Sequence, residues 1–241
     1  GPSQAGQAIG AGLQVDTSKY YNKVLEVNVE ERWARVEPGI VLDELNAQLA
    51  PYRLRFAPDI STASRATVGG MISNNSSGTR SVLYGKTIDH VLDLHVALAD
   101  SSVVHFQPLN KDELDAVCNE SSLEAKCYRT VRRIVAQHKK NIAERYPNIL
   151  RRVGGYNLNC FVNQNEPFNL AKLIVGSEGT LGLILEARLN LVPLPKAKVV
   201  LTIEYDNLLD ALGETPAILL HKPSAVEVMD RSILDHTTEN P

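Results

Sequence analysis

The 241-residue sequence lacks several features that define common protein classes. No run approaches the roughly 18 consecutive apolar residues of a membrane-spanning helix, so we expect no membrane span. A formal net charge of −3 gives no reason to expect nucleic acid as a partner. The three cysteines, Cys118, Cys127 and Cys160, are widely spaced, which argues against a disulfide framework. They favour a reducing, cytoplasmic compartment, with peripheral attachment at the inner face of the membrane left open.

Metal and nucleotide motifs are also scarce. No GxGxxG follows an expected strand, and no GxxxxGK[ST] phosphate loop occurs. The histidines form no HxxH-type cluster, so a catalytic metal site within this chain is not expected. They stand at His90, His95, His105, His138, His221 and His236.

The most informative stretch runs from residue 58 to residue 85 and is rich in glycine, asparagine, serine and threonine. Its few large apolar side chains predict that it is not itself a core element, and it is too long for an idle connection. The apolar residues spaced along it predict that it folds back on a core; they are Val68, Met71, Ile72, Val82 and Leu83. Glycine allows close approach to the backbone, and asparagine and serine offer donors to an anionic group. We interpret it as a wall for a phosphate-bearing cofactor. A solvated, flexible surface loop is the alternative.

Three ordered motifs carry a resemblance to a known family. The stretch with Pro58-Asp59, Ala66–Ile72, Asn75, Gly78 and Tyr84–Thr87 resembles the central FAD-binding segment of the FAD-linked oxidases, which share the vanillyl-alcohol-oxidase (PCMH-type) fold. Residues 3–10 resemble the end of the family's glycine-rich pyrophosphate loop, and residues 175–182 its late FAD-contact motif. Within the family, the chain is most similar to bacterial D-2-hydroxy-acid dehydrogenases of the glycolate, D-lactate and D-2-hydroxyglutarate type, including those fused to an iron–sulfur region.

The resemblance implies an α+β fold, namely the second subdomain of a PCMH-type FAD-binding domain, with an antiparallel or mixed sheet flanked by helices. We expect residues 1–195 to form this domain without its N-terminal βαβ part. Residues 196–241 would begin an α+β cap domain. The abrupt start, Gly1-Pro2-Ser3, predicts a fragment, although a remnant left by a protease would look the same. Because part of the cofactor cradle would be missing, we expect the isolated chain to bind FAD weakly or not at all.

The implied cofactor is FAD, and the implied reaction is oxidation of a small D-2-hydroxy acid by hydride transfer from Cα to flavin N5. Electrons would pass to a quinone or to an iron–sulfur protein or domain. The expected partners also include further copies of the same chain, in a homo-oligomer. Two alternatives remain: a flavin oxidase of the same fold acting on another alcohol, and a non-catalytic FAD-binding or accessory fragment.

The expected cofactor-binding residues belong to the three motifs. Arg80 is a candidate catalytic residue that would reach the substrate carboxylate or the flavin edge, with a surface salt bridge as its alternative role. The catalytic base and any metal ligands are expected outside the sequence. The cofactor-binding candidates are Ser3, Gly6, Gln7, Pro58, Asp59, Ser61, Thr62, Thr67, Gly69, Gly70, Asn74, Asn75, Gly78, Glu178, Gly179, Gly182 and Ile184.

Periodicity predicts the elements around these motifs. Alternating or β-rich runs predict strands over 13–16, 24–29, 33–36, 54–57, 91–98, 103–106, 181–191, 199–205 and 225–229. Apolar residues at helical spacing predict helices over 41–50, from 123 to Tyr146-Pro147, over 168–174 and over 208–220.

Overall fold

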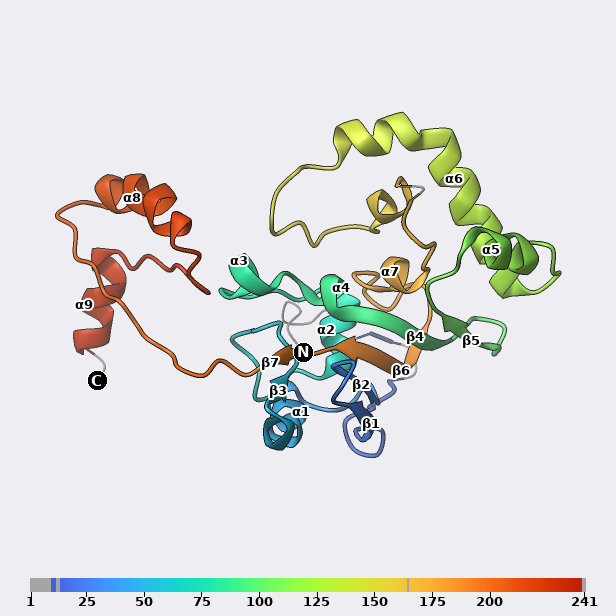
Figure 1. Ribbon diagram of the computed structural model, residues 1–241, viewed down its shortest axis with the longest axis horizontal. Helices are drawn as coiled ribbons and strands as arrows, with labels where there is room; N and C mark the ends of the chain where they lie inside the picture. Colours follow the sequence, from blue (N-terminus) through green and yellow to red (C-terminus); the bar gives the residue numbers. More distant parts are fainter. Residues whose placement is uncertain (1–9, 12–13, 164, 240–241) are drawn as a thin grey trace.

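The computed structural model describes residues 10–11, 14–163 and 165–239, and its centre is an antiparallel sheet of five strands in the order β1-β2-β6-β4-β5 (Figure 1). Strand β6, late in the chain, lies between β2 and β4 and so joins the two earlier hairpins. A second, two-stranded sheet pairs β3 with β7. The strands are β1 Val24–Asn28, β2 Trp33–Val36, β3 Leu54–Arg55, β4 Val91–Ala97, β5 Val103–Phe106, β6 Leu183–Asn190 and β7 Val192–Pro193.

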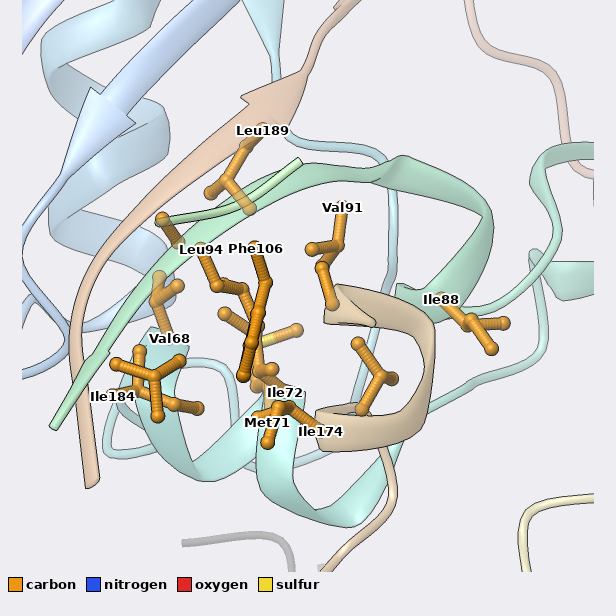
Figure 2. Packing of buried hydrophobic residues seen from close by; sticks show 14 of the residues in the cluster. Val68, Met71, Ile72, Ile88, Val91, Leu94, Phe106, Ile174, Ile184 and Leu189 are labelled. Atoms are coloured by element: carbon orange, nitrogen blue, oxygen red, sulfur yellow. The ribbon is translucent and has the colours of Figure 1, made fainter. Parts of the chain in front are cut away.

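Alternation along the strands turns one face of the sheet toward the core. In β2, Ala34 and Val36 are fully buried, while Arg35 between them is only half-buried. In β6, Leu189 is buried and its neighbour Arg188 is half-buried. Helices α2, α4 and α7 contribute apolar residues to the same core. Figure 2 shows that core, with Val68, Met71, Ile72, Ile88, Val91, Leu94, Phe106, Ile174, Ile184 and Leu189.

The opposite face of the sheet carries an ion cluster centred on Asp93, whose side chain is 1% exposed. Arg188 Nε lies 2.6 Å and His105 Nε2 lies 3.0 Å from its carboxylate. His95 stacks on His105 with 4.2 Å between ring centroids. A buried carboxylate needs polar or positively charged partners, and here Arg188 and His105 come from neighbouring strands, so the cluster favours the observed register.

Local sequence chemistry sets the helix ends. Ser122 caps α6 by accepting a hydrogen bond from the backbone N–H of Ala125 at 3.1 Å, and Asn110 caps α5 with Glu113 in a capping box. Pro51 follows the end of α1 in a short 3-10 turn. The helices are α1 Leu42–Leu49, α2 Val68–Asn74, α3 Ser81–Tyr84, α4 Thr87–His90, α5 Lys111–Cys118, α6 Leu123–Arg145, α7 Ala171–Ile174, α8 Leu208–Leu220 and α9 Arg231–Glu239, with 3-10 helices η1 Ala50–Tyr52 and η2 Leu158–Phe161.

The structure confirms the strands expected over 24–29, 33–36, 91–98 and 103–106. It also confirms the helix over 41–50, the long helix ending at Tyr146 and the helix over 208–220. The strand expected over 54–57 is shorter, and the helix expected over 168–174 forms only at 171–174. No strand forms over 14–16, and Leu13 lies outside the described residues. Helices α2, α3, α4, α5 and α9 were not predicted.

The prediction that residues 58–85 contribute no core element was wrong for α2. Its Val68, Met71 and Ile72 are all fully buried. Three apolar side chains at spacings of one and three residues were enough to give a seven-residue helix one buried face, despite two glycines in its first turn. The Thr67 side chain caps it by accepting the N–H of Gly70 at 3.3 Å.

Residues beyond β7 lie apart from the sheet (Figure 1, orange to red). The strands expected over 199–205 and 225–229 are absent. Val199 and Val200 are each 91% exposed. Without a partner strand, their backbone N–H and C=O groups form no interstrand hydrogen bonds. Helix α8 forms as expected but buries none of its residues.

Candidate cofactor site

Helix α2 delivers a polar turn, Asn74 to Ser77, to the surface beside the core. Asn75 ends the helix in the left-handed conformation, with φ of 54°, which asparagine tolerates better than most residues. Its side chain is fully buried, and Oδ1 accepts the backbone N–H of Ile88 at 3.0 Å. Nδ2 has no hydrogen-bond partner within the described part of the chain. A buried amide with an unused donor is costly by itself and is a natural point of attachment for a ligand acceptor.

The late motif docks directly onto the end of α2. The backbone N–H of Gly176 donates to Ile72 O and that of Glu178 donates to Ser73 O, both at 2.9 Å. The Asn74 side-chain amide donates to Glu178 Oε1 at 2.9 Å. Gly176, Glu178 and Gly179 all have positive φ, which bends the chain sharply. Two of the three predicted cofactor motifs, about a hundred residues apart, therefore meet at one place.

The chain around Asp59 closes against the same turn. An added Cβ on Gly78 would lie 1.4 Å from the Asp59 carbonyl oxygen, so only glycine allows this approach. Arg80 Nε lies 3.0 Å from Asp59 Oδ2, which is the salt-bridge alternative for Arg80. The neighbouring Arg55 stacks on Tyr84, with 4.9 Å between Cζ and the ring centroid. Burial lowers the pKa of Arg55, and the positive charge of Arg80 lowers it further.

The turn from Asn74 to Ser77, the residues that follow Asp59, and Val153 line a hollow of about 270 Å³, which we call the cofactor hollow. Its volume is just below the roughly 300–1,000 Å³ of complete small-molecule sites, so it can hold one part of a dinucleotide but not the whole. Hydroxyl and amide groups dominate its lining and suit the polar edges of a flavin or a phosphate. The lining residues are Ile60, Ser61, Thr62, Asn74, Asn75, Ser76, Ser77 and Val153.

The predicted site residues divide into three groups. Ser61, Thr62, Asn74 and Asn75 line the cofactor hollow. Asp59, Gly78 and Glu178 contact the segments that form it. The remaining described candidates are not among its lining residues; they are Pro58, Thr67, Gly69, Gly70, Gly179, Gly182 and Ile184.

Some of those remaining candidates have a visible packing role. A Cβ on Gly69 would lie 2.6 Å from Pro38 Cβ, and one on Gly182 would lie 2.6 Å from Val96 Cγ1. Ile184 is 5% exposed within the core. For these three, dense packing inside the domain accounts for the residue type. Ser3, Gly6 and Gln7 lie outside the described residues.

The family resemblance implied that residues 151–161 approach the active site, with a connecting turn as the alternative, but it named neither Val153 nor Arg151 as a site residue. Arg151 Nη2 donates to Gly78 O at 3.0 Å, and Val153 lines the cofactor hollow. Within that stretch, the Gly154-Gly155 pair marks a turn but does not show which segment the turn contacts.

The residues present fit FAD. The fit rests on the unpartnered, buried Asn75 Nδ2, the hydroxyl-rich lining and the meeting of two glycine-bearing turns. Among the described residues, no group of three or more His, Cys, Asp or Glu side chains could hold a metal ion, and no helix is long and apolar enough to cross a membrane.

Comparison with known families gives the class of the domain. Residues 1–107 match the family model described as FAD binding domain. The match confirms the predicted PCMH-type FAD-binding fold and its cofactor, FAD, and with them the resemblance to the FAD-linked oxidases.

Comparison with individual proteins extends the similarity over the whole chain. The D-2-hydroxyglutarate dehydrogenase of Pseudomonas putida is 41% identical over 234 residues, covering 97% of this chain and 23% of that protein. The Escherichia coli protein of the same name is 36% identical, covering 100% and 24%. Glycolate oxidase subunit GlcD of Bacillus subtilis is 28% identical, covering 90% and 36%. The chain spans about a quarter of the two dehydrogenases. A solved alkyldihydroxyacetonephosphate synthase superposes with a TM-score of 0.48 at 21% identity, over 76% of this chain and 23% of that one.

Proposed function

We propose that this chain is the FAD-binding part of a dehydrogenase that oxidises a D-2-hydroxy acid and passes the electrons to a quinone or an iron–sulfur acceptor. The single observation that carries the proposal is the junction of two FAD-type motifs, fixed by the Asn74–Glu178 hydrogen bond beside the cofactor hollow. The names of the related dehydrogenases support the substrate class.

The chain's own groups would bind and orient the cofactor. Asn75 Nδ2 is an unused donor held rigidly by the bond from Ile88 N–H to Oδ1, so it can donate to a flavin acceptor at little entropic cost. The hydroxyls of Ser61 and Thr62, which also line the hollow, can donate to anionic oxygens of the cofactor. FAD, when bound, supplies the two-electron acceptor that no side chain offers.

Other parts of the reaction need groups beyond those identified in this site. We assign residues 1–195 to the FAD-binding domain and residues 196–241 to the beginning of a cap domain. The catalytic base and any metal ligands are expected outside these 241 residues. Arg80 keeps its proposed role toward the substrate carboxylate or flavin edge, although its ion pair with Asp59 competes with it. A homo-oligomer and a cytoplasmic location stay predictions.

The test uses the full-length gene product. We expect it to carry a stoichiometric flavin whose absorbance is bleached anaerobically by D-2-hydroxyglutarate, D-lactate or glycolate. Ser77→Leu fills the cofactor hollow and should lower flavin occupancy about tenfold. Thr79→Leu, two residues along and outside the hollow, is the matched control and should leave occupancy unchanged. A flavin that none of these acids bleaches would favour the alternative of a non-catalytic FAD-binding or accessory fragment. Bleaching by another alcohol instead would favour a flavin oxidase of the same fold that acts on that alcohol.

A further inference from the structure

Ile88, in the short helix α4, is held through its backbone by two polar side chains. Its N–H donates to Asn75 Oδ1 at 3.0 Å, and its carbonyl accepts a hydrogen bond from Lys172 Nζ at 2.5 Å. The same ammonium donates to the carbonyl of Val91 at 2.9 Å. Asn75 ends α2 and Lys172 lies in α7, so one residue of α4 links the end of one predicted cofactor motif to the helix just before the other.

Helices α2 and α7 also meet directly. Four residues after Lys172, the backbone N–H of Gly176 donates to Ile72 O in α2 at 2.9 Å. An added Cβ on Gly176 would lie 3.4 Å from Asn75 Cβ, so the late motif packs beside the buried asparagine. Together with the bonds to α4, this contact closes a ring of three helices around Asn75. Each of the three helices contributes one isoleucine to the same core (Figure 2), namely Ile72, Ile88 and Ile174.

Lys172 completes this ring with a charged group that has little access to water. The residue is half-buried, and no carboxylate of the described residues forms an ion pair with it. Burial lowers the pKa of the ammonium, against the raising effects of Cys160, Asp89 and Glu166. The acceptors of Lys172 are backbone carbonyls where α4 passes into β4, and the end of a helix leaves such carbonyls without partners. Lys172 therefore fixes the end of α4, and with it Ile88.

The position of Ile88 decides how the Asn75 amide is oriented. Asn75 Nδ2 has no hydrogen-bond partner among the described residues, and Asn75 lines the cofactor hollow. A side-chain amide presents its N–H donors in a fixed direction only while its oxygen is held, because the two ends rotate together. The oxygen is held here by the Ile88 N–H. A shift of α4 would leave Asn75 Oδ1 unpaired or turn Nδ2 away.

We propose that Lys172 is a positioning residue for the cofactor, which acts through Ile88 to hold Asn75 Nδ2 toward an acceptor atom of bound FAD. The inference rests on the proposed function, in which Asn75 donates to the cofactor. Lys172 itself need not contact FAD. Its alternative role is to stabilise the packing of α7 on β4 and nothing more.

The chain offers a matched control for that alternative. Asn169, just before α7, donates from Nδ2 to the carbonyl of Leu92 in β4 at 2.8 Å. Its Oδ1 accepts the backbone N–H of Ala171 at 2.9 Å. Asn169 thus joins the same two elements by buried hydrogen bonds, but these bonds involve neither Ile88 nor Asn75.

The experiment uses the full-length protein, freed of its flavin and titrated with FAD, with flavin fluorescence as the measure of affinity. Lys172→Met keeps the length of the side chain without its ammonium, and should weaken FAD binding about tenfold through the loss of one oriented hydrogen bond. Asn75→Gly tolerates the positive φ of residue 75 and removes the donor, so it should weaken binding at least as much. In the Asn75→Gly background, Lys172→Met should then cost less than about twofold, because both residues act through the same hydrogen bond.

Two further variants separate positioning from stability. Asn169→Ala should lower the urea midpoint of unfolding as Lys172→Met does, yet leave the affinity for FAD unchanged. Lys172→Gln keeps an N–H donor without the charge, should lose less affinity than Lys172→Met, and provides a second variant for the same cycle if Lys172→Met does not fold.

The outcomes decide the role of Lys172 apart from the proposed function. Unchanged affinity for FAD in the Lys172 variants overturns the positioning role. Additive losses in the double variant, or an equal loss of affinity in Asn169→Ala, also overturn it, since either assigns Lys172 to the general stability of the domain. Coupled losses in a protein whose flavin no 2-hydroxy acid bleaches keep the role of Lys172 and remove the proposed function.

Discussion

Gly78 and the carbonyl oxygen of Asp59 approach so closely that an added Cβ would lie 1.4 Å from that oxygen. The contact lies directly next to Ile60 and Ser77, which line the cofactor hollow, and it involves backbone, which cannot rotate away. The approach of these two segments therefore requires that residue 78 have no side chain.

Gly78→Ala should therefore displace the segment around Asp59 and destabilise the domain by about 1–3 kcal/mol, the usual cost of overpacking. Flavin occupancy of the full-length protein should fall as well. Urea denaturation and flavin absorbance measure the two effects. Gly154→Ala is the control, because a Cβ there meets nothing within 4 Å and the residue has no positive φ. Equal behaviour of the two variants would contradict the packing argument.

Asn75→Ala tests the buried end of α2. The substitution leaves the backbone N–H of Ile88 without its acceptor and removes a residue that tolerates positive φ. We expect a loss of about 1–3 kcal/mol in the free energy of unfolding. Flavin affinity should fall further than in Ser76→Ala, whose hydroxyl donates only to Asn74 Oδ1 at 3.2 Å. A full flavin complement in Asn75→Ala would mean that Nδ2 serves no cofactor.

The sequence predicted the strands and helices that a local pattern of apolar residues determines. Alternation over 33–36 and 91–98 and the leucines of α1 specified their elements, because each pattern needs only one buried face. The meeting of Asn74 with Glu178 followed from the family resemblance and not from spacing, since contacts about a hundred residues apart leave no local pattern. The two strands expected beyond β7 failed for a related reason. Apolar runs predict a strand only where a partner strand is present.

Candidate residues were hardest to interpret where glycine has two possible uses. Gly69 and Gly182 stand in motifs that resemble FAD contacts, yet each lies against another part of this domain, Pro38 and Val96 respectively. A sequence shows that glycine is present but not which atom approaches it. The region of residues 151–161 was expected near the site, but Arg151 itself was not named, because its contact, the Gly78 carbonyl, is a backbone group that no sequence pattern marks.

Arg80→Ala separates the two roles of that residue. Its ion pair with Asp59 is about one-third exposed, so solvent screening limits the loss of stability to about 0–1 kcal/mol. If Arg80 contacts the substrate, KM for the 2-hydroxy acid should rise about tenfold with little change in unfolding. Asp59→Asn breaks the same ion pair but leaves the arginine, and is the control. Unchanged flavin content and unchanged KM in Arg80→Ala would leave Arg80 only its salt bridge.

His90 should make the stability of the domain depend on pH. Burial lowers the pKa of His90 below its ordinary 6.5, and Lys172 lowers it further, against the raising effects of the Tyr84 carbonyl, Asp89 and Asn190. The ring nitrogens fit the neutral form: Nε2 lies 2.6 Å from Tyr84 O and must donate, while Nδ1 lies 3.2 Å from the Asn190 amide and can accept. The unfolded chain thus binds more protons than the native state between the lowered pKa and about 6.5.

The stabilisation from neutral His90 is therefore fully present above about pH 6.5 and is lost as the pH falls through that window. His90→Gln keeps an amide donor for the Tyr84 carbonyl but cannot titrate. We expect its free energy of unfolding to fall less steeply than that of the parent between about pH 7 and pH 5. A residual slope should remain, because burial also lowers the pKa of His95. His138→Gln, on the exposed side of α6, is the control. Parallel curves for the parent and His90→Gln would show that the buried imidazole does not resist protonation.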